Sequence, residues 1–318
     1  MAEKKIFVVF GATGNQGGSV INAILGDPKT ADEFKIRGIT RDPSKPNAKA
    51  LAARGVECVA ADINNKDQIK SAFDGAYAVF AMTNYWEKMD AELEIRQGKN
   101  IADLAKESGV QHLIWSSLLD INTLTNGKYP GVEHFDSKAA VERYIREIGV
   151  PATFFLPGFF MTNIPGDALR QLPPDNDWAL ALPMPPDTPI PCIDIVSDTG
   201  KFIKGILTHR ESLLGKRVLA SVAYYTPTEI VATFAELYPE AGKKAKFAQL
   251  PEDVYKDALA QAGMSEKAQE DLYQTMAFMY EFGYYGKAGL DESHAILDGK
   301  LTTLKEFFST AKGFKGVQ

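Results

Sequence analysis

Short apolar runs alternate with amphipathic stretches through the first half of this 318-residue chain, and no other feature constrains its fold as strongly. Alternation of this kind predicts repeated βαβ units, in which crossover helices cover both faces of a parallel sheet. The expected strands span 5–10, 35–40, 56–60, 76–81, 111–116 and 152–156, and the expected helices lie near 16–26, 45–54, 66–73, 88–108 and 137–148. The sequence therefore predicts an α/β fold with a Rossmann-type, doubly wound parallel sheet.

The rhythm changes near residue 157. Seven prolines fall between Pro173 and Pro191, where their missing N–H groups predict loops or sheet edges rather than a helix. Beyond them, capping patterns at 226–229 and 303–306 predict helix starts, and 251–283 reads as two helices separated by Gly263. We therefore expect a nucleotide-binding domain over 1–156 and a smaller α+β domain over 157–318, from which strands can return to the first.

Composition narrows the classes of function. The net charge is −6 and the pI is about 5.4, with no basic face suited to nucleic acid. No stretch approaches the roughly 20 apolar residues of a membrane span. The two cysteines, Cys58 and Cys192, form neither a disulfide framework nor a metal-ligand spacing. We expect a cytoplasmic protein with no metal site and no direct contact with nucleic acid or membrane.

A glycine-rich turn follows the first expected strand and precedes the first expected helix. Glycines let the backbone approach a pyrophosphate, and the helix N-terminus offers free N–H groups to that anion. The spacing is G-x-x-G-x-x-G rather than G-x-G-x-x-G, so a purely structural turn remains the alternative. The candidate phosphate-binding residues are Gly11, Ala12, Thr13, Gly14, Asn15, Gln16 and Gly17.

The ends of the second and third strands bear on which dinucleotide binds. Arg41 stands where an NAD site usually has an acid, and its planar guanidinium suits a 2′-phosphate, with Lys45 adding charge. We therefore expect NADP(H) to be preferred over NAD(H). Asp42 leaves open a solvated charged loop instead. Asp62 can accept a hydrogen bond from the adenine amino group or cap the helix that follows.

Four segments together resemble a known family. They are 9–18, Thr40-Arg41-Asp42-Pro43, Thr83-Asn84-Tyr85-Trp86-Glu87 and His134-Phe135-Asp136-Ser137-Lys138. With them, nearly the whole chain resembles the NmrA-like family of atypical short-chain dehydrogenases/reductases, and within it the redox-sensor branch most strongly.

The resemblance implies a role for each part of the cofactor site. Gly11 to Gln16 would wrap the pyrophosphate, Arg41 and Lys45 would meet the 2′-phosphate, and Asp62 with Ile63 would border the adenine. Lys138 would bind the nicotinamide ribose. The nicotinamide side would be lined by Thr83, Asn84, Tyr85, Pro157, Gly158, Phe159 and Phe160.

The sequence alone leaves open whether the protein catalyses a reaction. Short-chain dehydrogenases use Tyr-x-x-x-Lys, and no tyrosine here has lysine four residues later; His134 stands in that place before Lys138. His134 can exchange a proton near neutral pH. A cationic imidazole beside Lys138 is disfavoured, however, which favours a His134 that only packs or hydrogen-bonds near the cofactor. Ser117 or its neighbour Ser116 could polarise a substrate, and Tyr129 could reach the site from a loop.

Two functions follow. In the first, the chain is an NADP(H)-dependent redox sensor or regulator that passes cofactor occupancy to a partner such as a transcription factor, in the cytoplasm and also the nucleus. The alternative is an NADPH-dependent oxidoreductase of a small carbonyl or imine, with His134 or Tyr129 as proton donor. The missing tyrosine favours the first, whereas an apolar pocket beside the nicotinamide would favour the second. Aromatic residues in 276–285 can line such a pocket, fill the core or form a homodimer contact.

Overall fold

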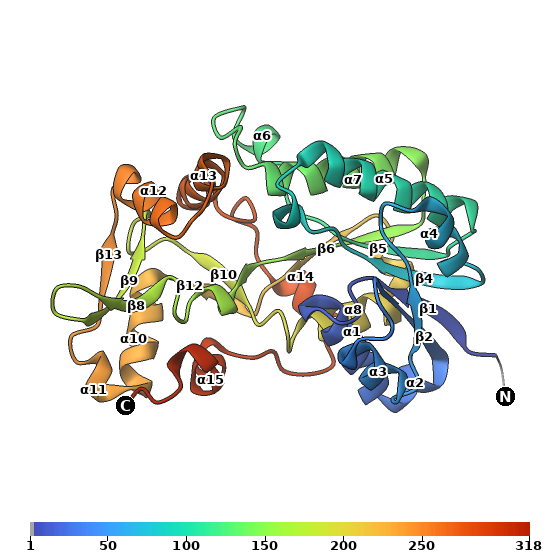
Figure 1. Ribbon diagram of the computed structural model, residues 1–318, viewed down its shortest axis with the longest axis horizontal. Coiled ribbons are helices and arrows are strands. Elements are labelled where there is room, and N and C mark those ends of the chain that lie inside the picture. The colour runs from blue at the N-terminus through green and yellow to red at the C-terminus, as the bar shows by residue number, and fades with distance from the viewer. Residues whose placement is uncertain (1–2) are drawn as a thin grey trace.

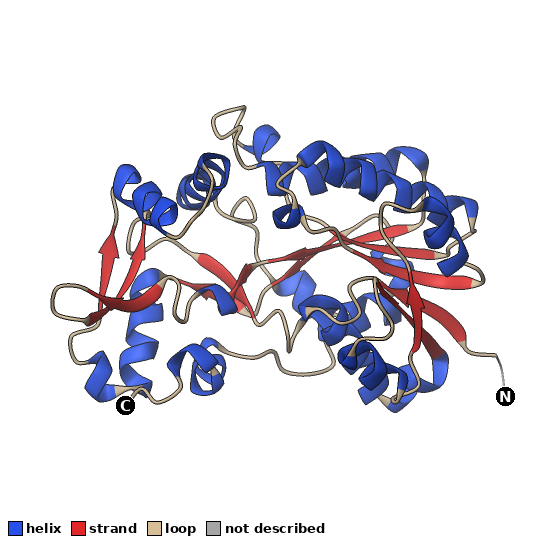
Figure 2. Ribbon diagram, in the orientation of Figure 1, coloured by secondary structure: helices blue, strands red, loops and turns tan. Residues whose placement is uncertain are grey.

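The computed structural model describes residues 3–318 and is built around a seven-stranded sheet in which every strand pair is parallel (Figures 1 and 2). The strand order is β11-β6-β5-β4-β1-β2-β3, so the chain direction across the sheet reverses between β1 and β4. The strands are β1 (Lys5–Val9), β2 (Phe34–Thr40), β3 (Glu57–Ala60), β4 (Ala76–Ala81), β5 (His112–Ser116), β6 (Ala152–Pro157) and β11 (Arg217–Ala220).

Helices cover both faces of this sheet, which confirms the predicted doubly wound fold (Figure 1). Apolar side chains from each layer pack onto the buried strands: Ile101 and Val141 on one face, Val20 and Phe202 on the other. One layer contains α4 (Lys66–Ala72), α5 (Ala91–Glu107) and α7 (Glu133–Ile148); the other contains α1 (Asn15–Gly26), α2 (Pro28–Glu33), α3 (Pro46–Ala52) and α8 (Thr199–Thr208).

The large sheet draws on chain from both sides of the predicted boundary at residue 157. Strand β11 pairs in parallel with β6, and α8 packs against α1. The tight contact is visible at Gly200, whose α-carbon lies so close to α1 that an added Cβ would be 2.1 Å from the Ser19 carbonyl oxygen. Strand β11, which follows residue 157, is therefore part of the large sheet.

The rest of the chain forms two three-stranded sheets, ordered β12-β10-β7 and β13-β9-β8, with short helices around them. The seven prolines between 173 and 191 all lie outside helices, as predicted, although Pro191 is in β10, the middle strand of its sheet. The strands are β7 (Phe159–Phe160), β8 (Leu169–Leu172), β9 (Asp177–Leu182), β10 (Ile190–Ile193), β12 (Ala223–Tyr225) and β13 (Lys246–Gln249). The helices are α9 (Arg210–Leu213), α10 (Pro227–Leu237), α11 (Pro239–Gly242), α12 (Glu252–Gln261), α13 (Glu266–Phe282), α14 (Asp291–His294) and α15 (Leu304–Thr310).

Both predicted capping boxes form. The Thr226 side chain accepts from the Glu229 backbone at the start of α10, and Thr303 does the same with Glu306 at α15. The pair of helices around Gly263 is also confirmed, as α12 and α13. Short elements complete the chain: α6 (Ile121–Leu124) and the 3-10 turns η1 (Tyr85–Glu87), η2 (Met161–Asn163) and η3 (Lys312–Phe314).

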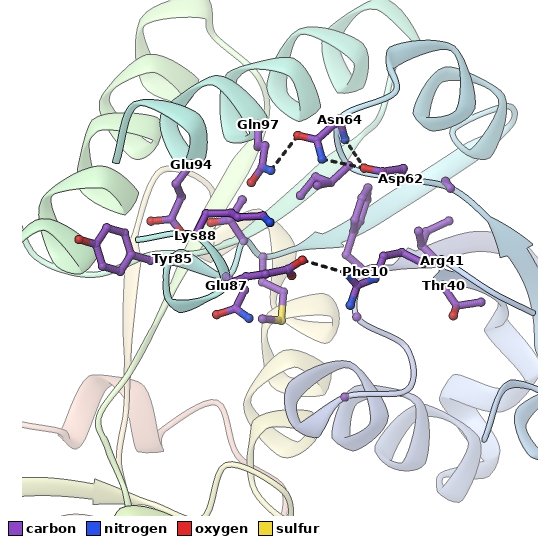
Figure 3. Close-up of a pocket in the computed structure, with 18 of the residues that line it drawn as sticks. Phe10, Thr40, Arg41, Asp62, Asn64, Tyr85, Glu87, Lys88, Glu94 and Gln97 are labelled. Atoms are coloured by element: carbon purple, nitrogen blue, oxygen red, sulfur yellow. Dashed lines mark hydrogen bonds and ion pairs between the residues drawn. The ribbon is translucent and has the colours of Figure 1, made fainter. Parts of the chain in front are cut away.

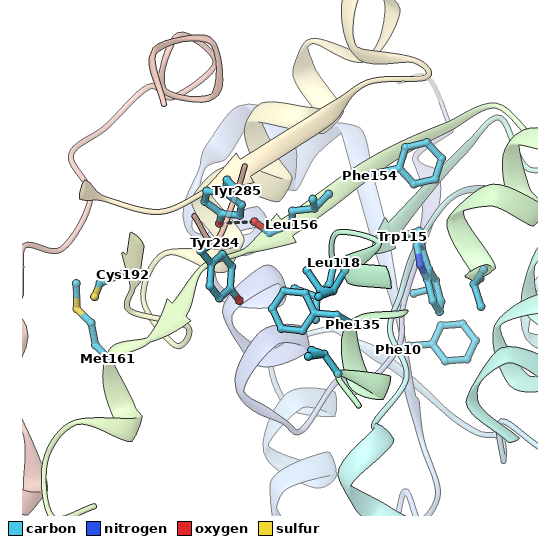
Figure 4. Close-up of a cluster of buried hydrophobic side chains, with 14 of the residues drawn as sticks. Phe10, Trp115, Leu118, Phe135, Phe154, Leu156, Met161, Cys192, Tyr284 and Tyr285 are labelled. Atoms are coloured by element: carbon cyan, nitrogen blue, oxygen red, sulfur yellow. Dashed lines mark hydrogen bonds between the residues drawn. The ribbon is translucent and has the colours of Figure 1, made fainter. Parts of the chain in front are cut away.

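Two tyrosines that follow α13, Tyr284 and Tyr285, connect the chain beyond residue 157 to the large sheet (Figure 4). The Tyr285 hydroxyl donates to the Leu156 carbonyl at 2.8 Å, and the Tyr284 hydroxyl donates to the Pro157 carbonyl at 3.1 Å. The Tyr284 ring also packs edge-on against Phe135 of α7, with centroids 5.3 Å apart. These contacts fix α13 beside the carboxyl ends of the parallel strands. Among residues 3–318, no helix is long and apolar enough to cross a bilayer.

Candidate functional site

Two adjoining cavities open at the carboxyl ends of the parallel strands, at the point where the strand order reverses. Open α/β sheets bind ligands at this position. The first cavity has a volume of about 440 Å³ and lies over β1, β2 and β4; the second, of about 340 Å³, lies over β4, β5 and β6. Met82, Thr83, Asn84 and Tyr85 line both, so the two cavities meet along the segment after β4.

The glycine turn forms one wall of the first cavity. Gly11 has φ +61°, and its carbonyl accepts from the Gly14 N–H at 2.8 Å, which closes a tight turn. Helix α1 starts directly afterwards and packs so closely that a Cβ on Gly17 would lie 2.3 Å from the Gly11 oxygen. No side chain caps this helix start within the described chain, so its first N–H groups remain available to an anion.

The predicted adenosine-side residues come together in the first cavity (Figure 3). Arg41 and Lys45 after β2 line it, together with Asp62 and Ile63 after β3. Arg41 is largely exposed and its Nη1 lies 2.9 Å from Glu87 Oε1 of η1. A guanidinium held at the cavity mouth by one exposed carboxylate can exchange that partner for a phosphate at little cost.

Two alternatives raised by the sequence are decided by local hydrogen bonds. Asp42 accepts from the backbone and hydroxyl of Ser44, so it closes its own turn rather than pairing with Arg41. Asp62 accepts from Asn64, whereas the cap of α4 is Asn65, so the prediction that Asp62 caps this helix is wrong.

Lys138 and His134 enter the second cavity from the same face of α7. This helix begins at Glu133, four residues before the predicted start, so both side chains are on one helix one turn apart. The Lys138 ammonium pairs with the Glu94 carboxylate of α5 and lies 3.2 Å from the Thr83 carbonyl. Ser137 donates to the other oxygen of this buried carboxylate.

His134 is paired with a second buried carboxylate, that of Asp271. Its Nδ1 is hydrogen-bonded to Asp271 Oδ1 of α13, and its backbone N–H donates to Asp271 Oδ2 at 3.1 Å. Asp271 is 1% exposed and His134 is 14% exposed. Because Nδ1 faces the carboxylate, Nε2 is the ring nitrogen left for the cavity.

Other candidates for catalysis are placed less favourably. Ser117 lines the second cavity, but its hydroxyl donates to Glu142 at 2.7 Å, so its only proton points away from a substrate. Ser116 donates to Gln16 at 3.1 Å. Tyr129 does not line the cavity: it packs against Phe282, and its burial raises the pKa of its hydroxyl well above the ordinary value. The structure therefore contradicts the prediction that Tyr129 can reach the site.

The wall of the second cavity is mostly apolar and aromatic. Pro157 at the end of β6 lines it, together with Gly158, Phe159 and Phe160 that follow. The rest of the wall comes from several elements. Leu272 and Met276 of α13 line it, and Met276 and Tyr284 belong to the predicted aromatic segment. Its other members are Trp86, Leu118 and Phe135.

Several residues of the site carry no signal in the local sequence. Asp271 reads as an ordinary charged position of a helix, and it lies 137 residues from His134. Glu94 reads as an acid in the first turn of α5, where exposure is common. Trp86 belongs to the motif Thr83–Glu87, but the sequence assigns it no role. Its ring centroid nevertheless lies 5.0 Å from that of His134. Between residues 3 and 318, no three His, Cys, Asp or Glu side chains gather as metal ligands.

The sheet order and the glycine turn at its switch point define an α/β protein of the Rossmann type with an open cleft beside an apolar cavity. The sequence profile of the NmrA-like family matches residues 3–308, and the chain belongs to that family. The NmrA-like family domain-containing oxidoreductase notA of Aspergillus sp. (strain MF297-2) is 32% identical and covers 96% of both chains. The oxidoreductase malD of Malbranchea aurantiaca is 32% identical over 78% of this chain and 76% of its own.

Solved structures agree on the fold. A crystal structure of NmrA, a negative transcriptional regulator, in complex with NADP superposes with a TM-score of 0.80 at 23% identity, covering 99% of this chain and 97% of that one. At this identity the likeness establishes the architecture, including the small mixed sheets that follow the parallel one.

Proposed function

We propose that this protein is an NADPH-dependent oxidoreductase that reduces a small, largely apolar carbonyl or imine compound. The observation that carries the proposal is the second cavity. It is mostly apolar, adjoins the cleft over the glycine turn, and has His134 and Lys138 in its wall. A pocket of this kind beside a dinucleotide cleft is the usual form of a small-molecule site. Relatives named as oxidoreductases support the same assignment.

The residues of the first cavity fit a dinucleotide. The turn at Gly11 and the start of α1 offer backbone N–H groups to a pyrophosphate. Arg41 and Lys45 would hold a 2′-phosphate, which supports NADP(H) over NAD(H), and Asp62 with Ile63 would border the adenine. NmrA has been solved with NADP and with NAD, so the preference here depends on Arg41 and Lys45 rather than on the fold.

The remaining predicted residues would act at the nicotinamide end. Bound NADPH supplies a hydride. Thr83, Asn84 and Tyr85 line both cavities and would hold the ribose and ring, with Pro157 to Phe160 on the far side. Lys138 would bind the ribose hydroxyls, and His134 would supply the proton that the reduced substrate atom takes up. The aromatic wall would exclude water from this step.

A redox sensor or regulator remains the second candidate. It is supported by the missing tyrosine before Lys138 and by the likeness to NmrA, a negative transcriptional regulator. In that function, cofactor binding would displace Glu87 from Arg41 and reshape the segment Thr83–Met89 for a protein partner. Oxidoreductase names among the relatives and the apolar cavity favour the enzyme over this function.

The test is a turnover assay with a matched variant. Purified protein is mixed with NADPH or NADH and a panel of aromatic aldehydes, quinones and cyclic imines, and NADPH absorbance is followed. We expect oxidation with at least one acceptor and its loss in His134→Phe, which preserves the aromatic contacts but has no exchangeable proton. A panel without turnover, while NADPH still binds, would favour the sensor function.

A further inference from the structure

We propose that Asp271 is a positioning residue for His134: it holds the imidazole with Nε2 toward the second cavity and balances the charge of the protonated ring. This inference rests on the proposed reductase function. The pairing joins α13, in the second part of the chain, to the helix that carries Lys138.

The contacts of Asp271 are those of a group built to hold one histidine. The carboxylate is 1% exposed, and burying an uncompensated carboxylate costs several kcal/mol. Oδ2 accepts from the His134 backbone N–H at 3.1 Å, and Oδ1 accepts from Nδ1 of the ring. The remaining contact is a long one, 3.5 Å, from the Thr275 hydroxyl, which bonds more closely to the Asp271 main-chain oxygen.

The ring is fixed on its other sides as well. Phe135 lies edge-on with its centroid 4.7 Å from that of His134, and Trp86 lies 5.0 Å away. Rotation of the imidazole about χ2 would therefore break the bond to Asp271 and meet aromatic neighbours. Nδ1 therefore stays hydrogen-bonded to Asp271 of α13, and Nε2 stays directed toward the second cavity.

Charges facing His134 are compensated in pairs. Lys138, one turn away, pairs with Glu94, and Glu133 pairs with Lys267 at 2.7 Å. The Tyr85 hydroxyl donates to Glu133 at 3.1 Å, so it presents no charge of its own. The sequence alone suggested that Lys138 would oppose a cationic imidazole. With Glu94 and Asp271 in place, a protonated His134 adds its charge to a site that already holds the matching anion.

Each reduction would use one hydride from NADPH and one proton from His134. The hydride forms a new C–H bond at the substrate carbon, and the pair from the C=O or C=N bond moves to oxygen or nitrogen. That atom takes the proton from Nε2 of the imidazolium. The ring left behind is neutral and keeps its proton on Nδ1, where Asp271 accepts it. A proton from solvent restores the imidazolium after product release.

The Asp271→Asn substitution makes a sharp test because of the second contact. The His134 backbone N–H requires an oxygen, so the amide oxygen takes that side and the amide NH₂ faces Nδ1. Nδ1 then becomes an acceptor, and the neutral ring carries its proton on Nε2, where it is a far weaker acid. Glu270→Gln, next along α13, removes the same charge from a residue that pairs with Lys256 instead of His134 and is the matched control.

Two measurements are made on the full-length protein with NADP⁺ or NADPH bound. Imidazole ¹⁵N NMR at a pH where the ring is neutral reports which nitrogen carries its single proton: we expect Nδ1 in the wild type and in Glu270→Gln, and Nε2 in Asp271→Asn. Turnover reports the catalytic consequence: we expect kcat to fall by about 10²- to 10⁴-fold in Asp271→Asn. The KM and the NADPH dissociation constant should stay within about threefold of wild type.

The outcomes separate the two proposals. A neutral wild-type ring whose single proton is on Nε2 overturns the positioning role without need of any variant. An unchanged kcat in a folded Asp271→Asn protein does so as well. A wild type that binds NADPH and shows the Nδ1 proton but reduces nothing overturns the reductase function, and the catalytic part of this inference with it.

Discussion

The Lys138 ammonium forms a buried ion pair with the Glu94 carboxylate, which reaches it from α5 across the helix layer. Glu94 is 2% exposed and Lys138 is 13% exposed. Removing one partner of such a pair leaves the other charge buried without compensation, which typically costs about 3–5 kcal/mol. The pair thus links the packing of α5 on α7 to the position of the lysine in the second cavity.

Glu94→Gln tests that link. We expect it to lower the free energy of unfolding by about 3 kcal/mol, the lower end of the range because the amide can still accept a hydrogen bond. Urea denaturation followed by circular dichroism measures the change. Glu92→Gln, two residues away on α5 and exposed, is the control and should differ from wild type by less than about 0.5 kcal/mol. Equal stabilities for the two variants would contradict the importance of the pair.

Arg41 is expected to decide between the two dinucleotides. Arg41→Ala removes charge-assisted hydrogen bonds to the 2′-phosphate, each worth about 1.5–3 kcal/mol, so NADPH affinity should fall by about 10- to 100-fold. NADH affinity should change by less than about threefold, since that dinucleotide lacks the phosphate. Fluorescence titration of both cofactors measures this. Arg170→Ala, in β8 at the far end of the molecule, should leave both affinities unchanged.

The first half of the fold could be predicted because the residues of each strand and helix show its own pattern of apolar and turn residues. Strands β2 and β4 were predicted to within one residue, since apolar runs bounded by turn residues leave little choice of register. The loops after β1, β2 and β4 carried most site residues, and parallel topology brings strand ends together. Local sequence was enough to gather Gly11, Arg41 and Thr83 in one cleft.

The parts that escaped prediction depend on contacts between distant segments. Nothing around Asp271 shows that its partner is His134, because the pairing follows from how α13 packs on α7. The start of α7 at Glu133 was missed because Val132 provides no side-chain cap. The short helix α2 was missed although Asp27 caps it with Pro28 at its first position, a signal that the wider alternation obscured.

Adjacent glycines in α1 provide a steric test of the phosphate turn. A Cβ on Gly17 would lie 2.3 Å from the Gly11 oxygen, whereas one on Gly18 would lie 3.6 Å from the nearest atom, the Ala12 oxygen. Gly17→Ala should therefore push α1 off the turn, destabilise the protein by about 1–3 kcal/mol and weaken NADPH binding at least about tenfold. Gly18→Ala should bind normally and gain up to about 1 kcal/mol from helix propensity. Thermal denaturation and NADPH titration of both variants decide the matter, and similar behaviour of the two would count against the turn at Gly11 as the phosphate site.

Asp136 predicts an unusual pH dependence. Burial raises the pKa of its carboxyl to about 6, helped by nearby Asp120 and opposed by Arg143 and by N–H donors from Ile121 and Asn122. A carboxyl whose pKa is higher in the folded than in the unfolded state takes up its proton more readily when folded. Its contribution to stability is therefore fully present below its unfolded-state pKa, near 4, and is lost as the pH rises through about 6.

Asp136→Asn isolates this contribution, because the amide oxygen can still accept from the Ile121 N–H but does not titrate. Between pH 7 and pH 4 the free energy of unfolding of the wild type should rise relative to that of the variant, with most of the change between about pH 6 and pH 4. Urea denaturation of both proteins across this range measures the difference. Asp257→Asn changes the same group at an exposed position of α12, a helix that packs against α13, and its difference from wild type should stay flat between pH 5 and pH 7. If the curves for wild type and Asp136→Asn run parallel through pH 6, the carboxyl titrates as it does in the unfolded chain and burial does not hold its proton.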